Sequence, residues 1–573
     1  MQQYGPLTEF SDLLHAEKYR SKGESFRECA TRVANALSDS EQHFKQIRDI
    51  FGTMRFLPAG RIQSAMGSLK QTTPYNCYVS GTIADSFTEG EGSIMNRATQ
   101  AAITMRMGGG IGYDFSTLRP NGALIRKLLS ASSGPVAFMG IFNEICKVTS
   151  SAGNRRGAQM GILRIDHPDI EEFIRAKQNR TALTGFNISV AVTDEFMEAV
   201  VANNDFKLRF GNDVYRTVRA ADLWEMLMRS TYDWAEPGVI FIDRINEMNN
   251  LYYCETIAAT NPCGEQPLPP FGACLLGSFN LVKYLYRGSP TSKWEFDYEQ
   301  FHLDIAPVVR AMDNVVDRAR YPLHEQEQEA QQKRRMGLGV TGLANTLEAM
   351  GAPYGSPEFI RGMASILSTL RNEAYRASAR LAAEKGHFPL FNKEKYLNGE
   401  FIQTLPEDVR DEIRASGIRN SHLLSIAPTG TISLAADNIS SGIEPVFAPS
   451  VSRKIIGESG ERTVTIFDYG ASVLNHRGKV AEECTLDDHL KVLITASKYV
   501  DSAVSKTCNV PTNINWEDFK SIYIRAWKAG CKGCTTYRVG GMREAVIQTN
   551  VEQPDEKSLA CSIDPSTGER SCE

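Results

Sequence analysis

The sequence lacks the features that would place it in a membrane or on a nucleic acid. No uninterrupted apolar stretch approaches the roughly 20 residues that a membrane-spanning helix needs. Residues 1–6 carry neither the basic region nor the apolar core of a secretory signal. The 63 basic and 68 acidic residues give a net charge of -5 without a polybasic run. We therefore expect a cytoplasmic protein that binds neither a membrane nor a nucleic acid.

The chain also has no internal repeat and no Pro/Gly/Ser-rich linker that would divide its body. A length of 573 residues allows about four average domains, but one large domain fits this uniform composition better. The twelve cysteines do not indicate a disulfide framework, because a reducing compartment keeps structural thiols reduced. Some of them are therefore candidates for catalytic or redox chemistry.

Three regions differ in pattern. Residues 1–55 carry apolar side chains at helical spacing, such as Cys29, Val33 and Leu37, and are expected to be helical. In residues 56–547, short β-rich runs alternate with helical stretches, which predicts an α/β layer or barrel and forms the expected catalytic domain. Residues 548–573 are polar and predict a mobile tail.

The strongest candidate for chemistry is an amide, a thiol and a carboxylate at alternate positions, Asn261, Cys263 and Glu265. Side chains at alternate positions of an extended chain point to one side. The neighbouring residues Pro262 and Gly264 favour a shaped loop over a helix. A thiol between a hydrogen-bonding amide and a carboxylate base suits chemistry on a hydroxyl group. The alternative is a simple turn with a buried cysteine.

Two further segments suit a phosphate or a closely approaching ligand. The segment from Thr429 to Ser433 follows a strand-like run, so a turn into a helix N-terminus would offer backbone N–H groups and hydroxyls, although it can be an ordinary N-cap. Residues 108–112 are glycine-rich and allow close approach, although such runs are more often tight turns. Their spacing matches neither a dinucleotide fingerprint nor a P-loop.

Paired guanidinium groups and paired thiols give weaker signals. Arg155 and Arg156 lie on a loop that suits a phosphate or a base, unless the loop is merely solvated. The pair Cys531 and Cys534 invites a zinc or thioredoxin-like interpretation, but no histidine completes a zinc site, and we predict a buried helix-to-strand junction. Thiols in a mobile tail can exchange disulfides, or can be idle surface groups; the tail carries Cys561 and Cys572.

Together, these motifs resemble the ribonucleotide reductase large-subunit family from about Phe56 to Arg543. The resemblance rests on Asn-Pro-Cys-Gly-Glu at 261–265, Asn-Cys at 76–77, Gly-Ser-Phe-Asn-Leu at 277–281, and the loops at 155–158 and 428–431. The motifs occur in the family's order and at comparable separations. The resemblance implies a ten-stranded α/β barrel with a central finger loop that carries Cys263.

The resemblance also implies a role for each residue. Cys263 becomes a thiyl radical that abstracts the ribose 3′ hydrogen, Glu265 takes the 3′-hydroxyl proton, and Asn261 holds the substrate hydroxyls. Cys77 and Cys274 supply two electrons by closing a disulfide as the 2′-hydroxyl leaves as water. The implied substrate-binding residues are Ser64, Asn76, Gly109, Gly110, Thr429, Gly430, Thr431, Ile432 and Ser433.

A specificity effector, a deoxynucleotide at a homodimer interface, is implied as well. Its residues would be Asp85, Ser86, Arg119, Asn154, Arg155, Arg156 and Gln159. The tail thiols would be a redox shuttle to a thioredoxin- or glutaredoxin-like reductant, although their spacing is wider than is usual in the family. The short N-terminal region leaves no room for an ATP-cone, so we expect specificity control without an on/off switch.

The source of the radical separates the classes of this family. The oxygen-dependent class passes its radical through a Tyr-Tyr pair, whereas Thr535, Thr536 and Tyr537 stand at that place here. The stretch resembles the adenosylcobalamin-dependent class, so we expect that cofactor and no protein-held metal. The alternatives are a reductase with a separate metal-containing subunit, and a non-catalytic nucleotide-binding protein. The sequence leaves open whether a ribonucleoside diphosphate or a triphosphate is the substrate.

Overall fold

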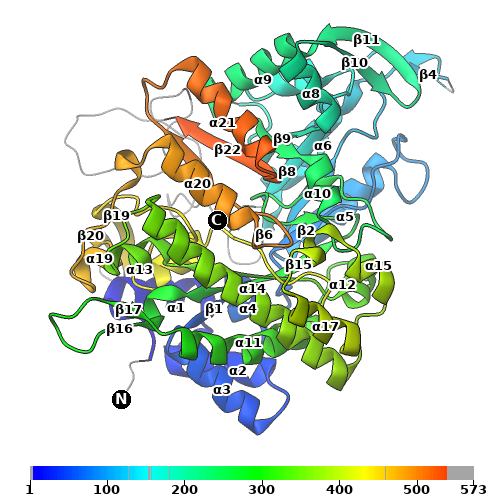
Figure 1. Cartoon of the computed structure of the whole chain (residues 1–573). Coiled ribbons are helices and arrows are strands. Elements are labelled where there is room, and N and C mark those ends of the chain that lie inside the picture. Colours follow the sequence, from blue (N-terminus) through cyan, green and yellow to red (C-terminus); the bar gives the residue numbers. More distant parts are fainter. Residues whose placement is uncertain are drawn as a thin grey trace.

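The computed structural model describes residues 4–126, 128–151, 155–156, 158–179, 181–457, 460–538 and 542. Its centre is a ten-stranded sheet in the order β1-β15-β2-β3-β8-β9-β12-β22-β21, with β18 beside β15 (Figure 1). The strands of this sheet are β1 (Phe56–Pro58), β2 (Cys77–Val79), β3 (Gly110–Asp114), β8 (Gln159–Arg164), β9 (Phe186–Val192), β12 (Gly238–Phe241), β15 (Ala273–Asn280), β18 (Met336–Thr341), β21 (Thr507–Val510) and β22 (Gly533–Arg538).

Strand direction divides nine of the strands into two groups, and β1 lies outside both as an antiparallel partner of β15. From β2 through β3, β8 and β9 to β12, every neighbouring pair is parallel. The pairs β15–β18 and β21–β22 are parallel too. The two groups meet in antiparallel pairs, β15 with β2 and β12 with β22. Two sets of parallel strands therefore run in opposite directions and join along two antiparallel seams.

Helices connect the parallel strands, as parallel pairing requires. In the first group the crossovers are α5 (Ile94–Arg106), α6 (Gly134–Val148), α7 (Ile170–Arg175), α8 (Asp194–Ala202) and α9 (Ala220–Trp234). Strands covered on both faces are apolar almost throughout. All eight residues of β15 are buried, and in β9 only Asn187 is exposed. Burial on both faces thus explains why these strands read as apolar runs in the sequence.

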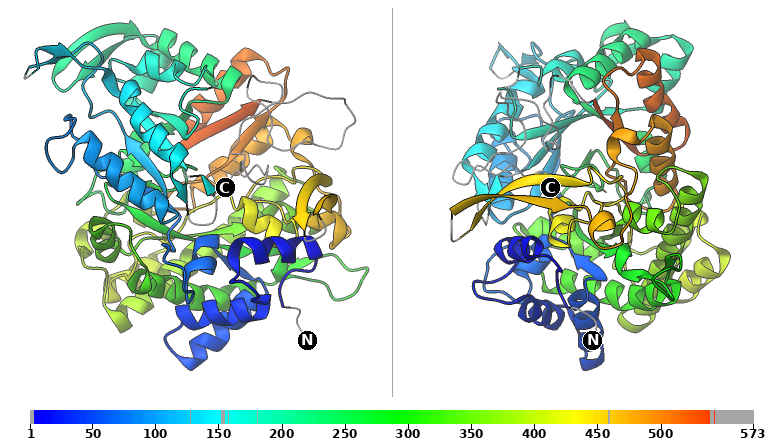
Figure 2. Two further views of the ribbon diagram at one scale, coloured as in Figure 1. Left: turned by 180° about the vertical axis from the view of Figure 1, so that it is seen from behind. Right: turned by 90° about the vertical axis from the view of Figure 1, so that its left-hand side faces the viewer.

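Three capped helices precede the sheet: α1 (Glu9–Tyr19), α2 (Phe26–Leu37) and α3 (Glu41–Gly52). Ser25 caps α2, and Glu28 returns the hydrogen bond in a capping box, which satisfies two otherwise unpaired N–H groups. The apolar stripe of α2 is buried at Cys29, Val33 and Leu37. Helices α2 and α3 pack against α11 (Tyr298–Arg318), and Figure 2 shows these blue helices at one end of the molecule.

Further α-helices surround the sheet. They are α4 (Gly60–Ala65), α10 (Ile242–Glu247), α12 (His324–Lys333), α13 (Leu343–Ala349), α14 (Pro357–Lys385), α15 (Lys393–Leu397), α16 (Glu400–Gln403), α17 (Glu407–Ser416), α18 (Gly430–Ala435), α19 (Tyr469–Ser472), α20 (Leu486–Ser497) and α21 (Trp516–Lys528). No helix in the described part of the chain is long and apolar enough to span a bilayer.

Within the described ranges, six two-stranded hairpins lie outside the main sheet. They are β4–β5 (Leu124–Ile125, Ser130–Ala131), β6–β7 (Ser150–Ser151, Arg155–Arg156), β10–β11 (Asp205–Phe210, Asp213–Arg219), β13–β14 (Ala259–Thr260, Pro267–Leu268), β16–β17 (Leu285–Tyr286, Glu295–Phe296) and β19–β20 (Ser450–Gly457, Gly460–Phe467). The β19–β20 hairpin projects from the body in the right-hand view of Figure 2. The hairpin β13–β14 carries the loop at 261–266 into the interior.

The mixed α/β class predicted from the sequence is confirmed. The expected closed ten-stranded barrel is not formed by the named strands, since β21 ends the sheet on one side and β18 pairs only with β15. Two isolated parallel bridges, Leu338 with Leu424 and Ile426 with Val504, lie between these ends. The predicted tail with Cys561 and Cys572 lies outside the described residues, so its mobility stays a prediction.

Candidate active site

The loop between β13 and β14 is a tight turn with Cys263 near its tip. The Asn261 N–H donates to Gln266 O at 3.1 Å, and the Gln266 N–H donates to Asn261 Oδ1 at 2.9 Å. Gly264 has φ +80, a left-handed conformation that other residues rarely adopt. Asn261, Cys263 and Glu265 all line one cavity, as predicted, but a closed turn and not an extended chain brings them together.

A glycine-rich strand makes room for this turn. A Cβ atom on Gly112 would lie 1.8 Å from Thr260 O, and one on Gly110 would lie 3.1 Å from Pro262 Cγ. The glycine run of β3 is therefore needed for the close approach of the β13–β14 hairpin, with Gly110 also lining the cavity. The sequence indicated close approach at this run, and the group that approaches is this chain's own loop.

Two cysteines from distant segments face each other behind the turn. Cys77 on β2 and Cys274 on β15 are direct partners across an antiparallel pair. Directly opposite residues in such a pair have Cα atoms roughly 4.5–5.5 Å apart, within the range that a disulfide spans. Cys77 lines the cavity, whereas Cys274 is fully buried beneath it. The pair sits on the seam between the two strand groups.

Hydrogen bonds connect Cys77 to the turn. Asn261 Nδ2 donates to Cys77 Sγ at 3.1 Å, and that thiol donates to Glu265 Oε1 at 3.7 Å. Burial raises the pKa of Cys77 well above its usual value, and the nearby Glu265 adds to the effect. Burial likewise raises the pKa of Cys274 and that of Glu265. Both thiols are therefore protonated at neutral pH and carry transferable hydrogens.

The cavity has an empty volume of about 900 Å³ that includes its open mouth. Two buried oxygens on its lining residues, Asn76 Oδ1 and Glu265 Oε2, have no hydrogen-bond partner among the described residues. Such atoms are costly unless a ligand or water donates to them. The lining residues are Leu57, Ala59, Gly60, Arg61, Asn76, Cys77, Gly108, Gly109, Gly110, Ala158, Asn261, Pro262, Cys263, Glu265, Leu276, Gly277, Ser278, Ala427, Pro428, Thr429, Gly430, Thr431 and Ile432.

The opposite wall is the turn that leads into α18. Thr429 has φ +56, and its Oγ1 accepts from the Gly442 N–H at 2.7 Å. Thr341 Oγ1 lies 3.0 Å from both Thr429 Oγ1 and Ser433 Oγ. These contacts hold the backbone of residues 429–432 against the cavity. Ser433 is buried and outside the lining, because its hydroxyl is used inside the turn.

The model of the ribonucleotide reductase barrel domain matches residues 76–476 and 476–537. The chain belongs to the ribonucleotide reductase family. A vitamin B12-dependent ribonucleoside-diphosphate reductase of Mycobacterium tuberculosis is 35% identical, over 84% of this chain and 70% of the relative. A vitamin B12-dependent ribonucleoside-diphosphate reductase of Thermoplasma acidophilum is 30% identical, over 93% of this chain and 70% of the relative. A ribonucleoside-diphosphate reductase subunit alpha of Chlamydia pneumoniae is 25% identical, over 88% and 55%.

Of the residues expected to hold a reductase effector, Asp85, Ser86, Arg119 and Gln159 lie outside the lining of this cavity. Arg119 Nε donates to Asp85 Oδ2 at 2.7 Å, so these two half-buried residues form an ion pair. Gln159 is buried and bonded to Tyr113 and Phe142, and so it serves the core. The hydroxyl of Ser86 accepts from the Glu89 N–H. Asn154 lies outside the described residues, as do the side chains of Arg155 and Arg156.

The Cys-x-x-Cys segment lies at a buried junction between α21 and β22, as predicted. Cys531 and Cys534 are buried, and the Cys534 thiol is hydrogen-bonded to that of Cys508. No group of three His, Cys, Asp or Glu residues within the described ranges is arranged to hold a metal ion. The segment is therefore part of the protein core.

Sequence motifs missed part of the cavity. Arg61, at the start of α4, is the one cationic side chain among the described lining residues. A Cβ on Gly108 would lie 2.7 Å from Arg61 Nη1, so this glycine lets the guanidinium lie against the strand. Ser64, which the sequence had favoured, donates to Arg61 O and lies outside the lining. The small residues Pro58, Ala59 and Gly60 directly before Arg61 are the local sequence feature that could have pointed to it as a binding residue.

Proposed function

We propose that this chain reduces ribonucleoside diphosphates to 2′-deoxyribonucleotides for DNA synthesis with a radical on Cys263. This proposal rests mainly on one cavity, which is lined by Cys263, Glu265, Asn261 and Cys77. Cys274 lies opposite Cys77 on the neighbouring strand. The diphosphate follows from the names of the Mycobacterium and Thermoplasma relatives. The same names support adenosylcobalamin as the cofactor.

The cavity fits this cofactor in two respects. A corrin ring carries its own cobalt, so it needs a wide and partly apolar surface more than a set of protein ligands. The cavity is open, Leu57 and Leu276 contribute apolar lining, and Cys263 in the same lining is partly exposed. When bound, adenosylcobalamin supplies a radical by homolysis of its cobalt–carbon bond. Every other step falls to side chains of this chain.

Each polar group in the turn has one task. Cys263, as a thiyl radical, takes the ribose 3′ hydrogen atom. Glu265 takes the 3′-hydroxyl proton, because its unpartnered Oε2 is buried beside the cavity, where a hydroxyl can donate to it. Asn261 orients the ribose hydroxyls. Residues 429–432 hold the phosphates through backbone N–H groups and hydroxyls, with Asn76, Gly109 and Gly110 along the nucleoside.

The thiols Cys77 and Cys274 act as the reductant. Loss of the 2′-hydroxyl as water consumes one proton, and replacement of that group by hydrogen requires two electrons and a second proton. Two thiols that close one disulfide deliver both protons and both electrons, so the exchange balances. The high pKa values of the buried pair keep both hydrogens in place until they are needed.

A reconstitution assay tests the function. The purified chain, adenosylcobalamin, a ribonucleoside diphosphate and a small dithiol should form deoxynucleotide without a second protein, measured by chromatography of the product. Omission of the cofactor is the control and should leave no product. Activity that requires a metal-containing partner protein would instead support the other radical source.

Arg61 is proposed to neutralise the substrate phosphates. Arg61→Gln should raise the KM for a ribonucleoside diphosphate about 10- to 100-fold, because a charge-assisted hydrogen bond contributes about 1.5–3 kcal/mol. The kcat should change less, since Arg61 lies outside the reacting turn. Steady-state kinetics measure both, with the exposed Lys70→Gln as control. A KM within twofold of wild type would exclude this role.

Dimerisation is proposed for the surface formed by α5, α6 and the β4–β5 hairpin. Large apolar side chains are exposed there, including Ile103, Leu128, Leu129 and Val148. Large apolar side chains exposed on elements that pack together, as α5 and α6 do, favour an interaction surface. A homodimer through this face would place the Asp85–Arg119 pair and Ser86 near a specificity effector bound between subunits. Asn154, Arg155 and Arg156 are proposed for the same site, with Gln159 acting only as a buried support.

The barrel and the C-terminal tail are proposed to support the active site. We propose that residues 423–426 lie between β18 and β21 and close a ten-stranded barrel that leaves out β1, which the bridges at Leu424 and Ile426 support. The division into a helical segment (1–55), a catalytic domain (56–547) and a redox tail (548–573) is part of this proposal. Cys561 and Cys572 would then pass electrons from a thioredoxin- or glutaredoxin-like protein to the buried pair.

A further inference from the structure

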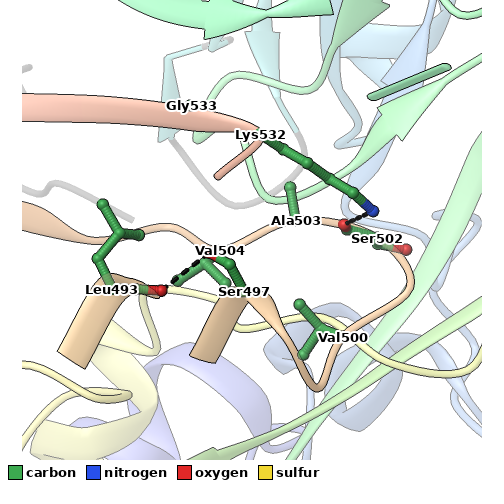
Figure 3. A pocket seen from close by; sticks show the side chains of 8 residues that line it. All are labelled: Leu493, Ser497, Val500, Ser502, Ala503, Val504, Lys532 and Gly533. Atoms are coloured by element: carbon green, nitrogen blue, oxygen red, sulfur yellow. Dashed lines mark hydrogen bonds between the residues drawn. The ribbon is translucent and has the colours of Figure 1, made fainter. Parts of the chain in front are cut away.

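Lys532 is a buried cation behind the catalytic turn. Its Nζ donates to the backbone oxygen of Ser502 at 2.6 Å (Figure 3). It also donates to the backbone oxygen of Asp501. Its own carbonyl accepts from the Phe241 N–H at 3.0 Å, which fixes its backbone to the end of β12. Burial lowers the pKa of Lys532 to about 8, although the nearby Asp501 raises it.

The segment held by Lys532 lies directly against the catalytic turn. The Ala503 N–H donates to Glu265 O at 3.0 Å. Ser425 Oγ donates to the same oxygen at 3.0 Å. The backbone of Glu265 is thus held by two donors, and one of them belongs to the residue next to Ser502.

Other bonds on this segment fix its far side. The Asp501 carboxylate accepts from the Leu423 and Leu424 N–H groups at 2.7 and 3.0 Å, and from Tyr375 Oη at 2.7 Å. Together with two backbone bonds, from the Ser502 N–H to Leu424 O at 3.1 Å and from the Ile426 N–H to Ala503 O at 3.1 Å, they tie residues 501–503 to the strand-like run at 423–426, which also supplies Ser425. Lys532 adds bonds to the two carbonyls that immediately precede Ala503. The Ser502 carbonyl belongs to the same peptide unit as the N–H that reaches Glu265, so Lys532 contributes to the placement of that N–H.

We propose that Lys532 is a positioning residue for catalysis, which sets the Glu265 carboxylate against Cys77 and the substrate through residues 501–503. It touches neither the cavity nor the reacting atoms, and the inference rests on the proposed role of Glu265. The position matters because Glu265 Oε1 accepts from the Cys77 thiol at 3.7 Å while Oε2 stays open to the substrate. A shift of about 1 Å at such a group can reduce a rate about 100-fold.

Steady-state kinetics of Lys532→Met test this role. The kcat should fall about 10- to 100-fold, while the KM for the nucleotide stays within twofold, because residues 429–432 and Arg61 are held by other contacts. Lys532→Arg, which keeps a cationic donor, should recover part of the lost kcat. Lys528→Met, an exposed lysine at the end of α21, is the matched control and should behave as wild type.

A second variant and a coupling measurement make the outcome decisive. If Lys532→Met does not fold, Lys532→Gln, which keeps a donor without the charge or the reach, should show the same loss in kcat alone. Ser425→Ala removes the second bond to Glu265 O, and its effect should not be additive with that of Lys532→Met. An unchanged kcat in the folded variants, or a rise in KM as large as the fall in kcat, would overturn the inference. An active Cys263→Ser would instead overturn the proposed function itself.

Discussion

Replacing Cys263 with serine is expected to lower deoxynucleotide formation by about 10⁴-fold or more, the scale of loss when the central member of a catalytic unit is removed. A serine O–H bond is much stronger than a thiol S–H bond, so the hydroxyl cannot become the hydrogen-abstracting radical. The substitution changes one atom at the tip of the turn. Product formation with adenosylcobalamin and a dithiol measures the loss.

The Kd of the Cys263→Ser variant for a ribonucleoside diphosphate should stay within about threefold of the wild-type value, because residues 429–432 are unaltered. Equilibrium dialysis with a labelled ribonucleoside diphosphate measures it. Cys254→Ser alters an exposed cysteine outside the cavity and serves as the control for handling of the thiols. A Cys263→Ser protein with appreciable turnover would refute the radical role of this residue.

The second large effect is expected at the reductant pair. Cys77→Ser and Cys274→Ser should each lower sustained turnover by about 10³-fold or more, since one remaining thiol cannot close a disulfide and so cannot deliver two electrons. The double variant should lose no more than either single one, because the two thiols act as a unit. Turnover with a small dithiol is the appropriate assay, since it bypasses the tail.

Cys29→Ser provides a matched control for this pair. Cys29 is as deeply buried as Cys274 but lies on α2, away from the cavity. Its replacement tests whether loss of any buried thiol disturbs the enzyme. If a single variant at Cys77 or Cys274 kept more than a tenth of the wild-type turnover, another reductant would have to supply the electrons.

Residue pattern alone predicted the α/β class, the helices within residues 1–55 and the buried junction at Cys531 and Cys534. These follow from periodicity and burial, which the sequence carries locally. The turn at 261–266 was predicted to bring its three polar side chains together, but for the wrong local reason. Its conformation depends on the glycines of β3, and no pattern within the turn itself reports that contact.

The pairing of Cys77 with Cys274 is a different case. The spacing of the two cysteines gave no evidence that they meet. Their contact depends on the register of β2 against β15, two strands far apart in the sequence. Arg61 and Lys532 were missed for a related reason. The roles of Arg61 and Lys532 depend on contacts with segments far away in the sequence. A single basic residue beside a glycine is too common to predict such contacts.

The two donors that hold Glu265 O have a consequence for the order of folding. The β13–β14 hairpin leaves the ribosome before Ser425 and Ala503 have been synthesised. Domains fold as they emerge, and distant contacts form late. The catalytic turn therefore acquires its final setting only when the last part of the described chain has docked. A nascent or truncated chain that ends before residue 503 would hold all five reacting side chains and still be inactive.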